Sequence, residues 1–194
     1  MQDDQQDTAQ WRAQIYALLA MLLAKPADAD LLGNIAALKV ESPDASLATA
    51  WQQLISAAAN TSAEAQTREY QKLFIGLTQG EVIPYASYYQ TGFLNEKPLA
   101  NLRADLGKLG LTRQDDKKEP EDHAAAVCDV MRLILIAKGT PVITAEQFYD
   151  RHMAKWLPRF FADLQKAPSA EFYAALAVFS QQFFTDEAQR FLAD

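Results

Sequence analysis

Large apolar residues recur along most of this chain every three or four positions, which is the spacing that places them on one side of an α-helix. The segment 8–24 is the first example, and Pro26 follows its end. No segment alternates β-branched and polar residues over the length of a strand. The pattern predicts an all-α bundle of nine or ten helices. Further helical stretches are predicted at 29–38, 47–60, 61–74, 98–109, 120–139, 144–161 and 169–183.

Polar residues at the starts of these stretches predict helix caps. Thr61 with Glu64, and Thr144 with Gln147, have the three-residue spacing of a capping box. Ser169 is the candidate N-cap of the last long helix. Within 144–161, an interruption near Pro158 is expected.

The segment 112–121, TRQDDKKEPE, contains no large apolar residue. It is the best candidate for a hinge within a single domain of residues 1–194, and it separates an N-terminal region, residues 1–111, from a C-terminal region, residues 122–194. Pro120 suits the first turn of the helix that follows. Asp122 and His123 would then lie in the same turn.

The stretch 69–89 begins as a helix and continues as a tyrosine-rich loop. Tyr70, Leu73 and Phe74 stand at i, i+3 and i+4, so they share one helical face. The loop after Pro84 contains Tyr85, Ser87, Tyr88 and Tyr89. Such side chains, apolar with a polar tip, suit the rim of a peptide-binding cleft. The alternative, favoured by these residues alone, is an ordinary helix end packed on the core.

Composition narrows the classes of partner. Hydrophobic residues make up 49% and charged residues 22%, as in soluble globular proteins. The net charge of −7 argues against nucleic acid as the main partner. The acidic start MQDDQQD is unlike a secretory signal, and the apolar run 15–24 is too short to span a bilayer, so no stable membrane insertion is expected. A single cysteine, Cys128, points to a reducing, intracellular setting.

Few residues of this chain are candidates for catalysis or for binding a metal or cofactor. Asp122 beside His123 could act as an acid–base pair or bind a cationic group, and the alternative is an acidic helix start with a surface histidine. Two histidines and one cysteine, without metal-binding spacing, predict no metal or cofactor. No phosphate loop is present, so the chain is not expected to be an enzyme. Two alternatives stay open: a small helical enzyme or weak nucleotide hydrolase using Asp122 and His123, and a plain helical interaction domain.

Three motifs taken together resemble those of one family. They are Tyr70-x-x-Leu73-Phe74, Pro84-Tyr85-x-Ser87-Tyr88-Tyr89, and Glu119-Pro120-Glu121-Asp122-His123. In this order and at this spacing the chain is similar to the TorD/DmsD/NarJ family of redox-enzyme maturation chaperones, and most similar to its TorD branch. The resemblance covers nearly the whole chain.

The resemblance implies a cytoplasmic, all-α chaperone that is not an enzyme. Members bind the twin-arginine signal peptide of a molybdenum enzyme, its folded core, or both, and delay export until the cofactor is inserted. A trimethylamine N-oxide (TMAO) reductase-like client is expected, with formate dehydrogenase, dimethyl sulfoxide reductase and nitrate reductase as alternatives. Molybdenum-cofactor biosynthesis proteins are further implied partners. Some relatives bind guanine nucleotides weakly, although no residue here carries that property over. The implied oligomeric state is a monomer or a dimer that exchanges helices across the hinge.

The resemblance also assigns roles to residues. Leu73 and Phe74 would receive the apolar stretch of the signal peptide in a groove, and Asp122 would receive its arginines. Tyr70 and Tyr85 stand where relatives often have tryptophan. The implied peptide-binding set is Tyr70, Leu73, Phe74, Pro84, Tyr85, Ser87, Tyr88, Asp122 and His123, with Glu119, Pro120 and Glu121 as hinge and acidic contacts.

Overall fold

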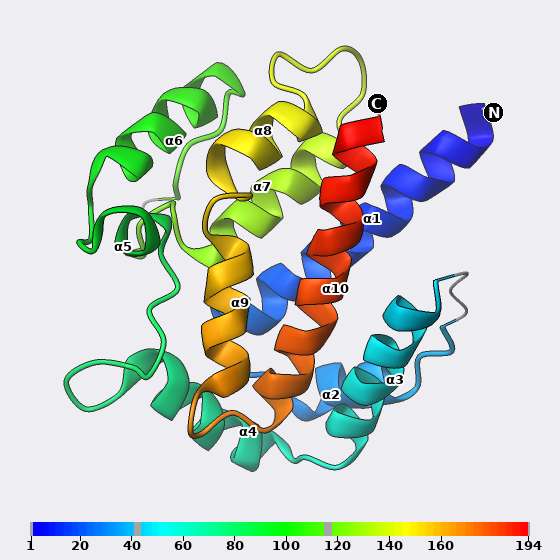
Figure 1. Ribbon diagram of the computed structural model, residues 1–194, viewed down its shortest axis with the longest axis vertical. Coiled ribbons are helices and arrows are strands. Elements are labelled where there is room, and N and C mark those ends of the chain that lie inside the picture. Colours follow the sequence, from blue (N-terminus) through cyan, green and yellow to red (C-terminus); the bar gives the residue numbers. More distant parts are fainter. Residues whose placement is uncertain (1, 41–43, 115–117, 194) are drawn as a thin grey trace. The chain divides into compact units, whose positions relative to one another are not determined.

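The computed structural model describes residues 2–40, 44–114 and 118–193, and its regular structure there is helical (Figure 1). These ranges contain ten α-helices and one short π-helix. Extended pairing within them is limited to one isolated bridge between Tyr85 and His123. The predicted all-α class, with nine or ten helices, is confirmed.

Two compact units divide the chain, and each contains segments that are distant in sequence. The first unit consists of the residues up to Ala24 together with Pro84–Leu157. The chain enters the second unit at Lys25, leaves it after Ile83, and returns to it at Pro158. The predicted hinge at 112–121 lies within the first unit, and its residues 115–117 fall outside the described ranges. A single domain with a hinge there stays a prediction.

The first unit is built around α1 and α7, which pack along each other (Figure 1). α5 packs against α6, and α8 packs against α7. Apolar residues at helical spacing explain the central pair, because Ile15, Leu19 and Leu22 of α1 are buried, as are Val127 and Met131 of α7. The helices of this unit are α1 (Gln2–Ala24), α5 (Ala86–Thr91), α6 (Lys97–Lys108), α7 (Ala124–Ile136) and α8 (Ala145–His152).

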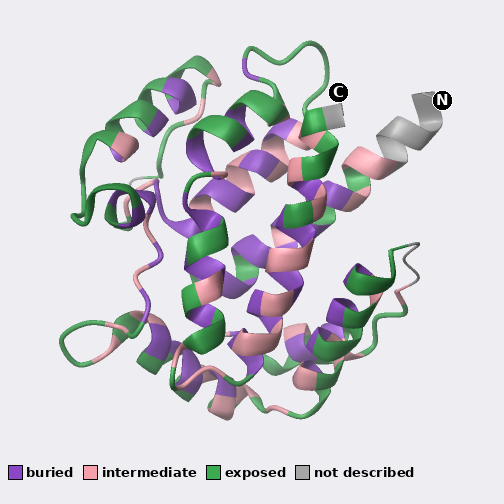
Figure 2. Cartoon of the chain, viewed as in Figure 1, coloured by how far each residue is buried: buried purple, intermediate pink, exposed green. Residues whose placement is uncertain are grey.

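The second unit has an aromatic core around α10. The ring of Trp51 on α3 lies 4.1 Å, centroid to centroid, from the ring of Phe179 on α10. Phe161 on α9 stacks on Phe184 at 5.5 Å. Figure 2 shows the buried positions repeating along these helices. The elements of this unit are α2 (Ala29–Ala36), α3 (Ala45–Ala59), α4 (Ala63–Tyr70), the π-helix η1 (Gln71–Ile75), α9 (Leu157–Lys166) and α10 (Phe172–Ala193). The first residue of α9, Leu157, is the last residue of the first unit.

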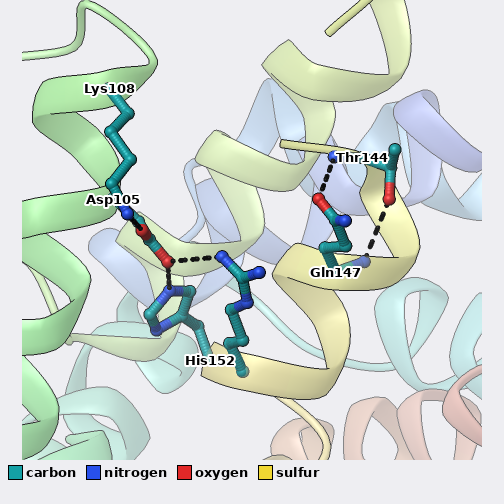
Figure 3. Close-up of polar contacts among 6 residues, drawn as sticks. Asp105, Lys108, Thr144, Gln147 and His152 are labelled. Atoms are coloured by element: carbon teal, nitrogen blue, oxygen red, sulfur yellow. Dashed lines mark hydrogen bonds and ion pairs between the residues drawn. The ribbon is translucent and has the colours of Figure 1, made fainter. Parts of the chain in front are cut away.

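Of the two predicted capping boxes, one is confirmed and the other is wrong. The Thr144–Gln147 capping box is confirmed, because each side chain bonds the other residue's backbone N–H at 3.2 Å (Figure 3). The prediction for Thr61 is wrong, because the Ser62 hydroxyl caps α4 through the N–H of Ala65. Both residues are good N-caps, so sequence alone does not choose between neighbours. α1 also begins earlier than predicted, at Gln2.

The predicted start of α7 at Pro120 is wrong. α7 begins at Ala124, and His123 is its N-cap with extended backbone angles. Asp122 and His123 therefore precede the helix rather than lying in its first turn. The physical reason is that residues 122–124 pair with residues 84–86, which holds their backbone in an extended conformation.

None of the helices in the described ranges combines the length and the hydrophobicity that crossing a bilayer requires.

Candidate functional site

The predicted site residues fall into two groups, one in each unit. Tyr70, Leu73 and Phe74 belong to the second unit. The first unit contains Pro84, Tyr85, Ser87, Tyr88, Glu119, Pro120, Glu121, Asp122 and His123.

In the first unit, backbone pairing joins the segments that carry the second and third sequence motifs. The N–H of Ala86 donates to the carbonyl of Asp122 at 3.0 Å, and the N–H of Ala124 donates to the carbonyl of Pro84 at 2.8 Å. These bonds flank the bridge between Tyr85 and His123. The pairing brings together residues that are far apart in the sequence, and it sets the start of α5 beside the start of α7.

Asp122 caps α5 from across this pairing. Its Oδ2 accepts hydrogen bonds from the N–H of Ser87 at 2.8 Å and from the hydroxyl of Ser87 at 2.6 Å. Asp122 is 1% exposed and Ser87 is fully buried. The other carboxylate oxygen of Asp122, Oδ1, is buried without a partner among the described residues. The predicted contact of Asp122 with arginines stays a prediction, and the structure gives this carboxylate a capping role in addition.

His123 caps α7 with its imidazole. Its Nδ1 accepts the N–H of Ala125 at 3.0 Å, so Nδ1 is unprotonated, and the ring lies edge-on to Tyr85 at 5.1 Å. Burial lowers the pKa of His123 to about 4, although the charges of Glu119 and Asp122 oppose this shift. The histidine is therefore neutral at pH 7.

The buried neutral His123 predicts a loss of stability in mild acid. The unfolded chain takes up a proton on this residue below its ordinary pKa of 6.5, whereas the native protein does so only near pH 4. The contribution of neutral His123 to the free energy of unfolding is therefore complete above pH 6.5. As the pH falls toward 4, the free energy of unfolding decreases by up to about 3 kcal/mol. Urea unfolding of wild type and His123→Asn at a series of pH values measures it.

Asparagine is the matched replacement because it can cap a helix but does not titrate. We expect the stability difference between wild type and His123→Asn to change with pH over this window. His152, whose pKa is also lowered by burial despite its bond to Asp105, contributes equally in both proteins. A pH-independent difference would show that His123 is not held neutral.

The exposed carboxylate of this site is Glu119. It accepts the hydroxyl hydrogen bond of Tyr85, which is half-buried. Glu121 is held differently, since Arg103 donates to its Oε2 from Nε at 3.0 Å and from Nη2 at 2.8 Å. Burial raises the pKa of Glu121, but the bonds from Arg103 outweigh it and the net shift is downward. Pro120 completes the turn by accepting the N–H of His123.

The second-unit group is organised by a π-helix rather than by the predicted continuation of α4. The N–H of Gly76 bonds the carbonyl of Gln71 at 2.7 Å, and Gly76 has a φ of +63°. A side chain there would meet the Gln79 carbonyl at 1.9 Å, so glycine is required. The Tyr70 and Phe74 rings remain in contact at 4.9 Å. Leu73 is fully buried, so its side chain belongs to the core, whereas Phe74 is half-buried.

Glu69, beside this group, was missed by sequence reasoning. Its carboxylate accepts the backbone N–H groups of Glu171, Phe172 and Tyr173 at 2.8, 3.1 and 2.8 Å. Glu69 is buried, and burial raises its pKa although the three N–H groups oppose that shift. Glu69 therefore caps the start of α10. The prediction that Ser169 is the N-cap of this helix is wrong, because Ser169 bonds the carboxylate of Glu81 instead. A lone Glu in a helix gives no signal for a partner 102 residues away.

A second buried carboxylate, Asp105 on α6, was also missed. Its Oδ2 lies 2.9 Å from Nε2 of His152 and 3.3 Å from Nη1 of Arg151, and its Oδ1 lies 2.6 Å from Nζ of Lys108 (Figure 3). Burial raises the pKa of Asp105, but these bonds prevail and lower it to about 2. Asp105 thus stays ionised and ties α6 to α8.

Comparisons with known proteins agree with the fold and with the family that the sequence resembles. The family described as nitrate reductase delta subunit matches residues 41–162. The chaperone protein TorD of Vibrio atlanticus is 27% identical over 188 residues, which are 86% of this chain and 87% of the relative. The TorD protein of Ferrimonas balearica is 30% identical over 185 residues, which are 87% of this chain and 84% of the relative.

A solved structure shares the fold. A protein of Archaeoglobus fulgidus that is assigned to redox enzyme maturation superposes with a TM-score of 0.63 at 21% identity, over 90% of this chain and 93% of that one. The family match covers more than half of this chain. The chain therefore belongs to the TorD/DmsD/NarJ family of redox-enzyme maturation chaperones.

Proposed function

We propose that this chaperone binds the precursor of a TMAO reductase-like molybdenum enzyme in the cytoplasm, through its twin-arginine signal peptide. It delays export until the cofactor is inserted, and it acts by binding, without turnover. The TorD relatives support this choice of client. Formate dehydrogenase, dimethyl sulfoxide reductase and nitrate reductase precursors are the alternative clients.

The main support for this proposal is the pair formed by Tyr85 and Glu119, whose side chains are hydrogen-bonded. An arginine side chain binds well where a carboxylate lies beside an aromatic ring, because the guanidinium can bond the first and stack on the second. Glu119 is exposed, and Tyr85 is fixed by its bridge to His123. The pair is therefore preorganised and open to solvent on one side. Binding then loses little side-chain entropy.

Apolar surface for the rest of the signal peptide lies close in sequence to this pair. Tyr88, Phe93 and Leu94 are 37%, 70% and 48% exposed, although large apolar side chains are usually buried. All three follow Tyr85 closely in the sequence, on α5 and the loop after it. Exposed apolar residues that follow the Tyr85–Glu119 pair closely in the sequence match a peptide with a basic start and an apolar helical stretch.

Calorimetric titration with synthetic signal peptides tests the proposal. We expect the twin-arginine peptide of a TMAO reductase to bind with a Kd of about 1 μM or tighter, and its twin-lysine version to bind more weakly. Glu119→Gln should weaken the twin-arginine peptide about fivefold at low salt and less at high salt, because salt screens an exposed charge. Tyr85→Ala should weaken it about tenfold.

The matched control is Glu146→Gln, which removes the same charge from an exposed position on α8. It should leave the affinity unchanged. If Glu119→Gln and Glu146→Gln weakened binding equally, Glu119 would act only through the overall charge of the protein and not through a contact with the peptide. No binding of any twin-arginine peptide would overturn the signal-peptide proposal.

Variants of the second-unit group need a different choice of residue. Leu73→Ala would leave a cavity in the core, so a loss of binding could follow from a loss of stability. Phe74→Ala is the better variant, since Phe74 is only half-buried.

A further inference from the structure

Glu121, the second acidic residue of the motif at 119–123, is bound to an arginine of the chain itself. Arg103 on α6 donates to its Oε2 from Nε at 3.0 Å and from Nη2 at 2.8 Å. Nε of Arg113 lies 4.0 Å from its Oε1. The side chain of Glu121 is 16% exposed, whereas that of Arg103 is 50% exposed. Arg103 therefore presents to this carboxylate the same chemical group that a twin-arginine peptide offers.

The contact between Arg103 and Glu121 is one that a second arginine can replace. In the strongest arginine–carboxylate pairs two N–H groups bond two oxygens, but here both N–H groups of Arg103 bond the same oxygen. An ion pair with an exposed partner is also weak, because water and salt screen it. Half of the Arg103 side chain is exposed, so it can turn into solvent without leaving its own charge buried.

Glu121 also lies close to the carboxylate at which we place the peptide. Only Pro120 separates it from Glu119, so the Cα atoms of the two acids are at most about 7 Å apart. Adjacent arginines of a peptide have Cα atoms about 3.8 Å apart and long side chains, so together they can reach two carboxylates at this spacing. Glu119 bonds a neutral hydroxyl, that of Tyr85, whereas Glu121 bonds a cation. The two carboxylates therefore differ in the charge that they offer to a peptide.

We propose that Arg103 competes with one arginine of the signal peptide for Glu121, and that it thereby sets how strongly the site distinguishes two arginines from one. The inference rests on the proposed function of the Tyr85–Glu119 pair. In the wild type, one arginine of the peptide binds Glu119, and the other must displace Arg103 before it binds Glu121. Without Arg103 both carboxylates are available at once, so the second arginine contributes more to the affinity.

The test is calorimetric titration of Arg103→Gln with the twin-arginine peptide of a TMAO reductase and with two versions in which one or the other arginine is glutamine. At low salt we expect the twin-arginine peptide to bind this variant about threefold to fivefold more tightly than the wild type, because no internal arginine is displaced. The single-arginine peptides should gain less. Adding Glu121→Gln to Arg103→Gln should return the affinity to the wild-type level, because it removes the carboxylate that the peptide had gained.

Arg132→Gln is the matched control, because it removes the same charge from an ion pair with Asp129 on α7. It should bind the peptide like the wild type, and circular dichroism checks that both variants fold. If Arg103 only held residues 119–123 in place, Arg103→Gln would weaken binding instead, which is the opposite sign. Unchanged or weaker binding by Arg103→Gln, or an equal gain in Arg132→Gln, would overturn the competition alone.

The wild type separates this inference from the proposed function on which it rests. If the wild type bound no twin-arginine peptide, the proposed function would fail and the competition with it. If the wild type bound the peptide and Arg103→Gln bound it no more tightly, the proposed function would stand and Arg103 would not be a competitor.

Discussion

Glu69→Ala is expected to lower the free energy of unfolding by about 4 to 5 kcal/mol, the largest effect of a single substitution that we predict. The carboxylate of Glu69 accepts three backbone N–H groups at the start of α10. Each buried donor left without a partner costs about 1 to 3 kcal/mol, and the favourable charge at the helix N-terminus is lost as well. Urea denaturation followed by circular dichroism measures the change.

Two further variants separate this bonding from the effects of charge. Glu69→Gln keeps one acceptor oxygen, so it should lose only some of the stability that Glu69→Ala loses. Glu171→Ala removes a neighbouring exposed carboxylate at the same helix start and should change stability little. If Glu69→Ala cost no more than Glu171→Ala, the three hydrogen bonds would not be what holds the start of α10.

Asp122→Ala is expected to destabilise the protein by about 3 to 4 kcal/mol. The substitution leaves the buried N–H and hydroxyl of Ser87 without their acceptor, and bonds to a charged group contribute about 1.5 to 3 kcal/mol each. The Asp122 Oδ1, which is buried without a partner among the described residues, makes the net loss smaller than the sum of the two bonds. Urea unfolding of the variant measures this loss.

A double-mutant cycle with Ser87→Ala isolates the contact between the two side chains. The two substitutions should be non-additive, because Ser87→Ala already removes one of the two bonds to Asp122. A further variant, Asp122→Asn, can be titrated with twin-arginine and twin-lysine peptides. If Asp122 bonds an arginine directly, the preference for twin-arginine should shrink in Asp122→Asn. Additive stabilities would contradict the hydrogen bond between the Ser87 hydroxyl and the Asp122 carboxylate.

The capping geometry gives a physical reason for the spacing of the motifs. Asp122 caps α5, which starts at Ala86, and His123 caps α7, which starts at Ala124. One extended pairing therefore fixes the starts of two helices and sets Tyr85 against His123. Changing Pro84, Ser87, Asp122 or His123 would disturb the frame that presents Tyr85 and Glu119, even where the residue itself does not touch a peptide.

The sequence by itself determined the helical class and most helix positions. Apolar residues at a period near 3.6, closed by local caps such as Thr144 with Gln147, are set by interactions within a few residues. The motifs also indicated the family without coordinates, and the family match and the TorD relatives confirmed it. Glu119 and Tyr85 were among the predicted site residues, although their hydrogen bond was not predicted.

Only the tertiary structure decided which polar groups are buried and what they bond. Glu69 and the start of α10 are more than 100 residues apart, Asp105 and His152 are 47 apart, and Ser87 and Asp122 are 35 apart. A residue's type states what it can bond, but its burial and partner depend on how helices pack, and many packings satisfy the same local pattern.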